Sequence, residues 1–547
     1  MNKPLFIIFL ILSSYCIQTY AQTSLPKDLA TRIKNEGYSN SQVESLAQFF
    51  TDKLGPRLAG SQMNSRAEEL VIAKLEEMGF TNARIEYAAD FPQGGWDNQM
   101  NYVAMTYPYY CSFSANPKAW SGSTNGLVKG ECILFDVKNI DELKKYKGKL
   151  SNKIVIMPTN KKYQINFKPS ASRYTNEELT ILQKGEQLNN QFKNSQHNST
   201  FVKRLSSYIR NTTIRSFLNK ENALAIVVGS GTLNNPISTR VNYKTGNPEP
   251  IPEIIISMEN HGRMARMLAK GEKVEMELNI KNIFTNNHTI NNIIAEIPGT
   301  DPKLKHEVIL LGAHLDSWHG GTGAADNASG CVVMIEALRI IKELGIQPKR
   351  TIRIALWGGE EQGRRGSRGY AKQYLYDEQK GEVLPNFNNF ALYLNMDNGS
   401  GQFRGIYLEG NKKAVSYFDV WKKEIDTLGF NTLSTNSIGN TDHQSFAIYG
   451  LPAYQFIQDK LEYDRTYHSI MDTYDHLSIE DLKNNAVITA WLSLNAAMDD
   501  TKIPVIPINF EKRAKYQHIN KYKEIVKGFI YYQIYKKGID KYLFSKN

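Results

Sequence analysis

Residues 308–317 read VILLGAHLDS, an apolar run that leads directly into a histidine and an aspartate. This pattern is typical of a buried strand with polar side chains at its carboxyl end. From residue 290 onward, expected strands at 306–313, 350–357 and 390–396 alternate with expected helices at 328–344, 367–375 and 414–428. Strands separated by long helices need crossover connections. The sequence therefore predicts an α/β fold with a mostly parallel central sheet and helices on both of its faces.

Ionisable side chains follow these strands at the point where each strand ends. In open parallel sheets the carboxyl ends of the strands meet at one edge, where function collects. The residues concerned are His314 and Asp316, Asp326 in the glycine-rich loop 320–330, the adjacent Glu360 and Glu361, Asp397, and His468 in the loop 467–473. We expect several of these side chains to lie close together.

This set of side chains favours a metal centre. Two histidines and several carboxylates, with no thiolate, suit zinc or a comparable divalent ion. Two ions about 3.5–4 Å apart, sharing one bridging carboxylate, can activate a water molecule and polarise a carbonyl oxygen. A further carboxylate must accept the proton, which accounts for two adjacent glutamates. Any one of these acids alone is more often a cap or a solvated loop residue, but three successive strands end in such groups.

Five motifs resemble the co-catalytic zinc exopeptidases of metallopeptidase family twenty-eight, which includes leucyl aminopeptidases, glutamate carboxypeptidases and carboxypeptidase Q. They are GAHLDSW at 312–318, ADNASG at 325–330, WGGEE at 357–361, MD at 396–397 and HSIMDT at 468–473. The similarity extends over about residues 42–498 and includes GPRLAGS at 55–61. It implies the zinc exopeptidase fold.

The resemblance also implies two Zn²⁺ ions per chain and a role for each site residue. Asp326 would bridge the two metals, Glu360 would be the general base, and Asp316 would orient His314. Tyr467 would stabilise the oxyanion, with a core-packed aromatic as the alternative. Asp442 and His443 resemble a specificity segment and would contact substrate or, alternatively, make structural hydrogen bonds. The implied ligand sets are His314, Asp326 and Asp397 for one metal and Asp326, Glu361 and His468 for the other.

The chain is expected to have four parts. Residues 1–21 form a signal peptide, 22–116 and 285–500 form the catalytic domain, 117–284 form an insertion, and 501–547 form a basic extension. The insertion contains short apolar strands among polar turns and is similar to a β-rich protease-associated domain. The extension accounts for most of the formal charge of +11, which argues against nucleic-acid binding.

The N-terminus predicts export. Lys3 precedes the apolar run 5–12, and small residues at positions 19 and 21 favour cleavage after Ala21. A lipid anchor on Cys16 and an uncleaved anchor are the alternatives. Cleavage implies a secreted or periplasmic protein without stable membrane insertion. An oxidising compartment would allow Cys111 and Cys132 to pair, while Cys331 is expected to be a buried hydrophobe. The glycosylation sequons at Asn327 and Asn398 adjoin expected ligands and are interpreted as chance.

The resulting hypothesis is a secreted zinc exopeptidase that acts on short peptides next to a free terminus, with homodimer formation possible. Aminopeptidase and carboxypeptidase or dipeptidase activity both stay open, because the choice depends on which free terminus is recognised. A slight preference for the carboxypeptidase Q branch rests on HLDSW at 314–318 and on the insertion. The alternatives are a glutaminyl cyclase-like transferase with one zinc and a catalytically inactive receptor-like binding protein.

Overall fold

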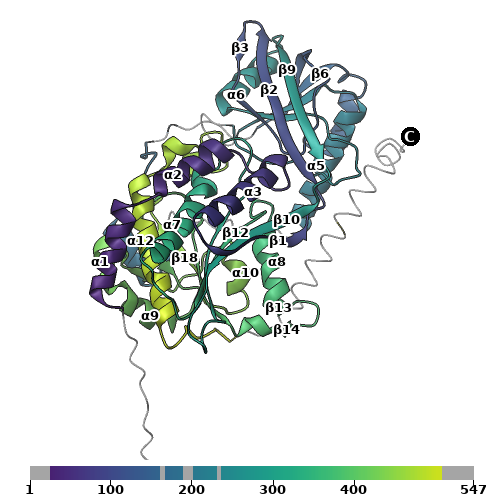
Figure 1. The fold of residues 1–547 in the computed structure, drawn as a ribbon. Coiled ribbons are helices and arrows are strands. Elements are labelled where there is room, and N and C mark those ends of the chain that lie inside the picture. The colour runs from purple at the N-terminus through teal and green to yellow at the C-terminus, as the bar shows by residue number, and fades with distance from the viewer. Residues whose placement is uncertain are drawn as a thin grey trace, which may run out of the picture.

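The computed structural model describes residues 25–159, 165, 167–188, 201–230, 236–507 and 526. These residues form a larger lower body and a smaller upper body, and each is built on a sheet of its own (Figure 1). The expected signal peptide and nearly all of the expected basic extension lie outside the described residues. None of the described helices is long and apolar enough to cross a membrane.

The central sheet of the lower body has eight strands in the order β1-β10-β12-β11-β15-β18-β16-β17. The four middle strands β12, β11, β15 and β18 are parallel, whereas β1, β10 and β16 pair antiparallel to their inner neighbours. The predicted α/β class is confirmed, with antiparallel additions at both edges. The strands are β1 (Thr81–Asp90), β10 (Thr289–Ile297), β11 (Val308–His314), β12 (Thr351–Trp357), β15 (Phe390–Asn395), β16 (Phe403–Tyr407), β17 (Thr432–Ser434) and β18 (Ala453–Gln458).

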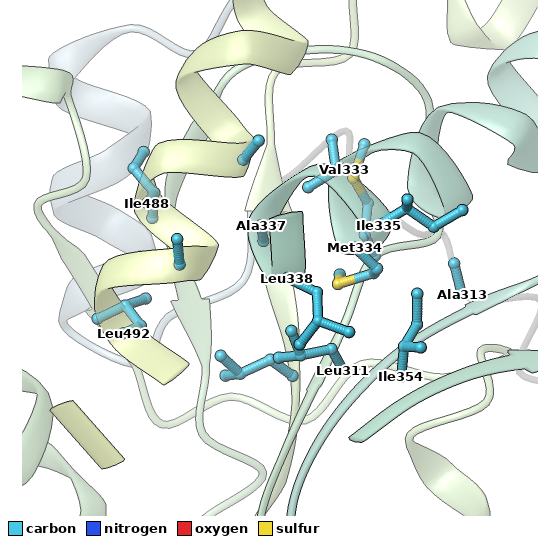
Figure 2. Close-up of a cluster of buried hydrophobic side chains, with 14 of the residues drawn as sticks. Leu311, Ala313, Val333, Met334, Ile335, Ala337, Leu338, Ile354, Ile488 and Leu492 are labelled. Atoms are coloured by element: carbon cyan, nitrogen blue, oxygen red, sulfur yellow. The ribbon is translucent and has the colours of Figure 1, made fainter. Parts of the chain in front are cut away.

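Helices cover both faces of this sheet because its middle strands are apolar on both sides. Leu311 and Ile354 face α7 and α12, as Figure 2 shows, whereas Leu310 and Ala355 face α8 and α10 on the opposite side. The first face also carries α1, α2 and α3 (Figure 1). The helices are α1 (Lys27–Ser39), α2 (Val43–Gln48), α3 (Gln62–Glu77), α7 (Ser329–Glu343), α8 (Arg365–Tyr374), α9 (Ala414–Trp421), α10 (Gln444–Ala447), α11 (Tyr463–Thr466) and α12 (Ile479–Met498).

The upper body is a second eight-stranded sheet in the order β3-β2-β9-β5-β6-β7-β8-β4. It begins at Gly95, upstream of the boundary expected at 117, because the long strand β2 pairs with β9 along its whole length. Its helices include α5 (Phe201–Lys220) and α6 (Met258–Ala269), whereas α4 (Asn176–Gln183), from the same part of the sequence, packs against β17 of the lower sheet. The strands are β2 (Gly95–Tyr107), β3 (Cys111–Ser112), β4 (Ala115–Pro117), β5 (Val128–Leu134), β6 (Lys153–Ile156), β7 (Ala225–Gly229), β8 (Glu253–Ile256) and β9 (Glu275–Thr285).

The cysteine pairing considered for the insertion is not formed. Cys111, Cys132 and Cys331 are all free, and Cys132 and Cys331 are buried. Cys111 lies on β3 and Cys132 on β5, with β2 and β9 between them. Three strand spacings amount to about 14 Å, whereas a disulfide needs Cα atoms within about 7 Å. Sheet order therefore keeps these two thiols apart.

Candidate active site

Most of the predicted site residues lie at the carboxyl ends of three adjacent parallel strands. His314 is the last residue of β11, the turn at 358–361 follows β12, and Asp397 follows β15. β11 lies between β12 and β15, so these groups meet at one edge of the sheet. Asp326 lies in the turn before α7, and His468 lies in the loop after α11. The structure thus brings together all five predicted metal ligands and Glu360.

Asp326 occupies the centre of this group. Its Oδ1 lies 3.1 Å from His314 Nε2, and its Oδ2 lies 3.4 Å from His468 Nε2. On the first side, His314 Nε2 is also 3.3 Å from Asp397 Oδ1. On the second side, His468 Nε2 is 2.9 Å from Glu361 Oε2. The two oxygens of one carboxylate therefore face two separate sets of metal-type donors.

Two clusters of donor atoms can each hold a metal ion. His314, Glu360 and Asp397 form one, and Asp326, Glu361 and His468 form the other; within each, the donor atoms lie within 4.8 Å of one another. Asp326 Oδ2 and Glu361 Oε1 are buried without a hydrogen-bond partner. Buried carboxylate oxygens without partners are costly unless a cation compensates them. The donor set fits zinc, which prefers histidine and carboxylate ligands in such a mixture.

The crowded carboxylates of this cluster shift the pKa values of several site residues. Burial, together with the charge of Asp326, raises the pKa of Glu361 to about 7. Burial opposes protonation of His314, but Asp397 and Asp326 outweigh it and raise its pKa well above the usual value. Burial and the charges of Asp397 and Asp442 also raise the pKa of Glu360 well above its ordinary range. So much negative charge in one buried place favours a bound cation.

Asp316 supports both His314 and the glutamates. His314 Nδ1 lies 2.8 Å from the main-chain oxygen of Asp316 and 3.7 Å from its Oδ1. The carboxylate of Asp316 accepts the backbone N–H groups of Glu360 (3.0 Å) and Glu361 (3.3 Å). Its main chain thus contacts His314 more closely than its side chain does, and its side chain fixes the turn that carries the two glutamates.

Two tyrosines flank the site. Tyr467 is half exposed, and its ring stacks on His468 with centroids 3.7 Å apart. Burial and the nearby Asp326 raise its pKa, so its hydroxyl stays protonated and able to donate. Tyr463, one helical turn earlier, hydrogen-bonds to Asp326. A core-packed role for Tyr467 does not fit its exposure.

The two predicted substrate contacts differ in their surroundings. Asp442 is fully buried beside the cluster; its Oδ1 accepts from Ser367 Oγ at 2.5 Å, and its Oδ2 has no hydrogen-bond partner. Burial raises its pKa to about 7. His443 is also fully buried, with Nδ1 2.5 Å from Thr441 Oγ1 and Nε2 3.1 Å from Glu409 Oε1. Both ring nitrogens face protein groups, which favours the structural alternative for His443.

Sequence reasoning missed several residues that hold the site. Asp472 accepts the N–H groups of Ala325 (2.6 Å) and Asp326 (3.1 Å), and Trp318 Nε1 donates to Glu361 Oε2 (2.7 Å). Arg57 is fully buried and donates to main-chain oxygens that include those of Leu315 and Gly323. Asp472, Trp318 and Arg57 all lie in the quoted motifs, so the motifs located them without indicating their contacts.

The upper body also reaches the site. Ser238 N donates to the carbonyl of His468 at 2.5 Å, and Ile470 N donates to the carbonyl of Pro236 at 3.3 Å. Ser238 Oγ accepts from Gly320 N (3.1 Å) and from Asn116 Nδ2 (2.9 Å). No motif in the sequence indicated this contact.

Residues 292–492 match the family model described as peptidase family M28. The chain therefore contains a peptidase family M28 domain. Among curated proteins it is 26% identical to carboxypeptidase Q of Mus musculus over 468 residues, which cover 85% of this chain and 88% of the relative. The carboxypeptidase Q of Homo sapiens is also 26% identical, with 85% of this chain and 87% of the relative covered.

Solved structures share the same fold. A peptidase M28 precursor from Shewanella amazonensis matches with a TM-score of 0.61 at 22% identity, covering 88% of this chain and 99% of that one. A zinc aminopeptidase from Bacillus subtilis matches with a TM-score of 0.51 at 18% identity, covering 86% and 98%. The two matches cover 88% and 86% of this chain, so the aligned regions extend beyond the catalytic sheet.

Proposed function

We propose that this chain is a zinc-dependent exopeptidase that hydrolyses short peptides next to a free terminus. The observation that carries the proposal is Asp326, whose two oxygens face His314 and His468 at 3.1 and 3.4 Å. The M28 domain and the carboxypeptidase Q relatives support the same class. So does a curated relative named leupeptin-inactivating enzyme 1, which is 28% identical over 37% of this chain and 47% of its own length.

Two zinc ions per chain fit the donor atoms. His314 and Asp397 would hold one, Glu361 and His468 would hold the other, and Asp326 would bridge them. Zinc held there would make a water molecule more acidic and polarise the scissile carbonyl. Both histidines and all the carboxylates of the expected set are present, which argues against an inactive receptor-like role.

The chain's own residues would then handle the protons. Glu360 lies in the cluster with His314 and Asp397, and its raised pKa suits a group that takes a proton from water and passes it to the leaving nitrogen. Asp316 would hold Glu360 in place through the backbone N–H contact. Tyr467 would donate its hydroxyl hydrogen to the oxygen that becomes negatively charged.

A pocket beside the second metal cluster provides access to this chemistry. It is lined by Trp318, Gly321, Gly323, Asp326, Glu361, His468, Ser469 and Asp472. The second metal cluster is therefore the one that opens to the outside.

The site of action and the assembly are also proposals. Export through the signal peptide 1–21 would place the enzyme outside the cytoplasm, as the N-terminal sequence favours. The insertion, as a protease-associated-like unit, would form one wall of the active site through Ser238 and its neighbours. Homodimer formation is compatible with this arrangement.

The test is hydrolysis of di- and tripeptides blocked at one terminus or the other, before and after chelation. We expect cleavage of peptides with one particular terminus free, loss of activity with a chelator, and recovery with added zinc. Peptide cleavage that survives complete zinc removal would contradict the proposal, as would cleavage only inside long chains blocked at both ends.

A further inference from the structure

Two arginines follow Glu360 at intervals of four residues. The N–H of Arg364 donates to the carbonyl of Glu360 at 2.8 Å, and the N–H of Arg368 donates to the carbonyl of Arg364 at 3.1 Å. Arg364 immediately precedes α8, and Arg368 lies in its first turn. The guanidinium of Arg368 interacts electrostatically with the carboxylates of Glu360 and Asp442. Arg364 and Arg368, the α8 arginine pair, therefore lie beside the proposed proton acceptor.

Arg364 is held in a definite position. Its guanidinium donates to the carbonyl of Thr441 at 3.4 Å and to the side-chain oxygen of Gln444. Its φ of 57° is in the left-handed region that residues with side chains seldom adopt. Such backbone strain concentrates at functional sites, where the surrounding structure enforces it.

Arg368 is exposed, and its guanidinium makes no hydrogen bond or ion pair with any residue that the structure describes. The neighbouring Glu378 interacts electrostatically with Arg368 but is shared with Lys372 (2.6 Å) and with the hydroxyl of Tyr449 (3.0 Å). Like charges four residues apart on a helix repel each other. The Arg368 guanidinium thus offers hydrogen-bond donors that no described residue occupies, close to Glu360 and Asp442.

The chemistry of the proposed reaction indicates which part of the substrate would lie near the α8 arginine pair. A general base that takes a proton from water delivers it to the leaving nitrogen, so the released residue lies on the Glu360 side. A carboxylate on that residue would meet the two guanidinium groups, whose planar arrays of donors match a carboxylate.

We propose that the α8 arginine pair is a subsite for a free carboxylate on the residue released by the enzyme. This inference rests on the proposed exopeptidase function and specifies its substrate class: peptides whose released residue carries a carboxylate. The carboxylate can be the C-terminal α-carboxylate or the side chain of Asp or Glu. The first source corresponds to carboxypeptidase or dipeptidase action, which recognises the carboxyl end.

Four substrates separate the two sources: Ala-Ala, Ala-Ala amide, Ala-Glu amide and Ala-Gln amide. We expect Arg368→Gln to lower kcat/KM about 10- to 100-fold, mainly through KM, only for substrates with a carboxylate on the released residue. Loss with Ala-Ala but not with Ala-Ala amide assigns the α-carboxylate. Loss confined to Ala-Glu amide assigns the side chain. Arg364→Gln should give the same pattern, and Arg368→Lys should recover part of the loss.

Arg365→Gln is the matched control. Arg365 lies between these two arginines in sequence, but its guanidinium points elsewhere. It donates to the carbonyl of Asp90 (3.2 Å) and lies 5.5 Å from the centroid of the Phe91 ring. This variant should leave the ratio of kcat/KM between acid and amide substrates unchanged. An Arg368→Gln variant that affects all four substrates equally, or none of them, would overturn the proposal.

A binding measurement keeps this inference distinct from the proposed function. If the wild-type enzyme hydrolyses none of the four substrates, the exopeptidase proposal fails, and calorimetry still tests the subsite. The wild type should bind N-acetylglutamate at least tenfold more tightly than N-acetylglutamine amide, and Arg368→Gln should abolish that difference. Equal binding of the two compounds by the wild type would overturn the subsite.

Discussion

The ring of His468 faces Asp326, and the main chain of the same histidine is bound by the upper body. The ring Nε2 of His468 lies 3.4 Å from Asp326 Oδ2, while its main-chain carbonyl accepts the N–H of Ser238 from the upper body. His468 has a φ of 54°, in the left-handed region where a side chain is unfavourable. The hydrogen bonds from Ser238 N to the carbonyl of His468 and from Ile470 N to the carbonyl of Pro236 hold this conformation. The second half of the site therefore depends on both bodies of the molecule.

The position of Asp326 predicts unequal effects of removing ligands. Asp326→Ala should weaken both zinc sites, because each of its oxygens faces a different cluster. His314→Ala should weaken mainly the site that it shares with Asp397. Zinc titration followed by elemental analysis measures this directly. Retention of one tightly bound zinc in Asp326→Ala would contradict the bridging role.

Ser238→Ala tests the contact between the two bodies. The change leaves the buried Asn116 amide and the N–H of Gly320 without their common acceptor. We expect about 1–3 kcal/mol lower free energy of unfolding, as for other orphaned buried donors. Ser416→Ala is a suitable control, since its exposed hydroxyl donates to Lys413 O at the start of α9; it should stay within about 0.5 kcal/mol. Chemical unfolding measures both, and equal stability of the two variants would argue against the contact.

Glu68 predicts a pH dependence of stability away from the metal ligands. Burial raises its pKa from 4.5 to about 7, against the opposing hydrogen bonds from Asn291 and Asn64. The folded protein therefore holds this proton more tightly than the unfolded chain does. As a result, the contribution of Glu68 to the free energy of unfolding falls as pH rises from 4.5 to 7, in total by about 3 kcal/mol.

Glu68→Gln should remove that fall. The stability of the variant relative to the wild type should increase between pH 4.5 and 7 and then level off. Urea unfolding of both proteins across this pH range gives the difference. If the difference in unfolding free energy between the two proteins does not change with pH, the pKa of Glu68 is not raised in the folded protein.

The sheet order predicts three reactive thiols in the denatured protein that starts at residue 22. Cys111 and Cys132 are separated by two strands, and Cys331 is buried in α7. Thiol titration in denaturant without reductant should count three. A count of one would instead indicate a bridge between Cys111 and Cys132 and a different order of strands.

The central strands and the convergence of the site were predictable because the signals are local. An apolar run such as 308–313, followed by a histidine, fixes a buried strand and its functional end. The strand β2 was not predicted, because polar residues such as Asp97, Asn98 and Gln99 interrupt any alternation. The boundary of the insertion was misplaced for the same reason.

Contacts between distant residues could not be predicted. Ser238 meets His468, and Arg57 meets Leu315, across more than two hundred residues of sequence. Nothing near Ser238 in the chain signals a partner, since the contact arises from the packing of the two bodies. The backbone contacts of Asp316 likewise depend on the β11–β12 pairing rather than on its motif.

The division of roles between Glu360 and Glu361 is the central claim, and two glutamine variants test it. Glu361 Oε2 lies 2.9 Å from His468 Nε2, whereas Glu360 is held by Asp316 in the other cluster. Glu360→Gln should keep two zinc ions and lose about 10²–10⁴-fold in kcat. Glu361→Gln should lose one zinc ion and regain part of its activity in excess zinc. Zinc content and turnover, measured side by side, decide the matter: zinc loss in Glu360→Gln with two zinc ions retained in Glu361→Gln would contradict the account.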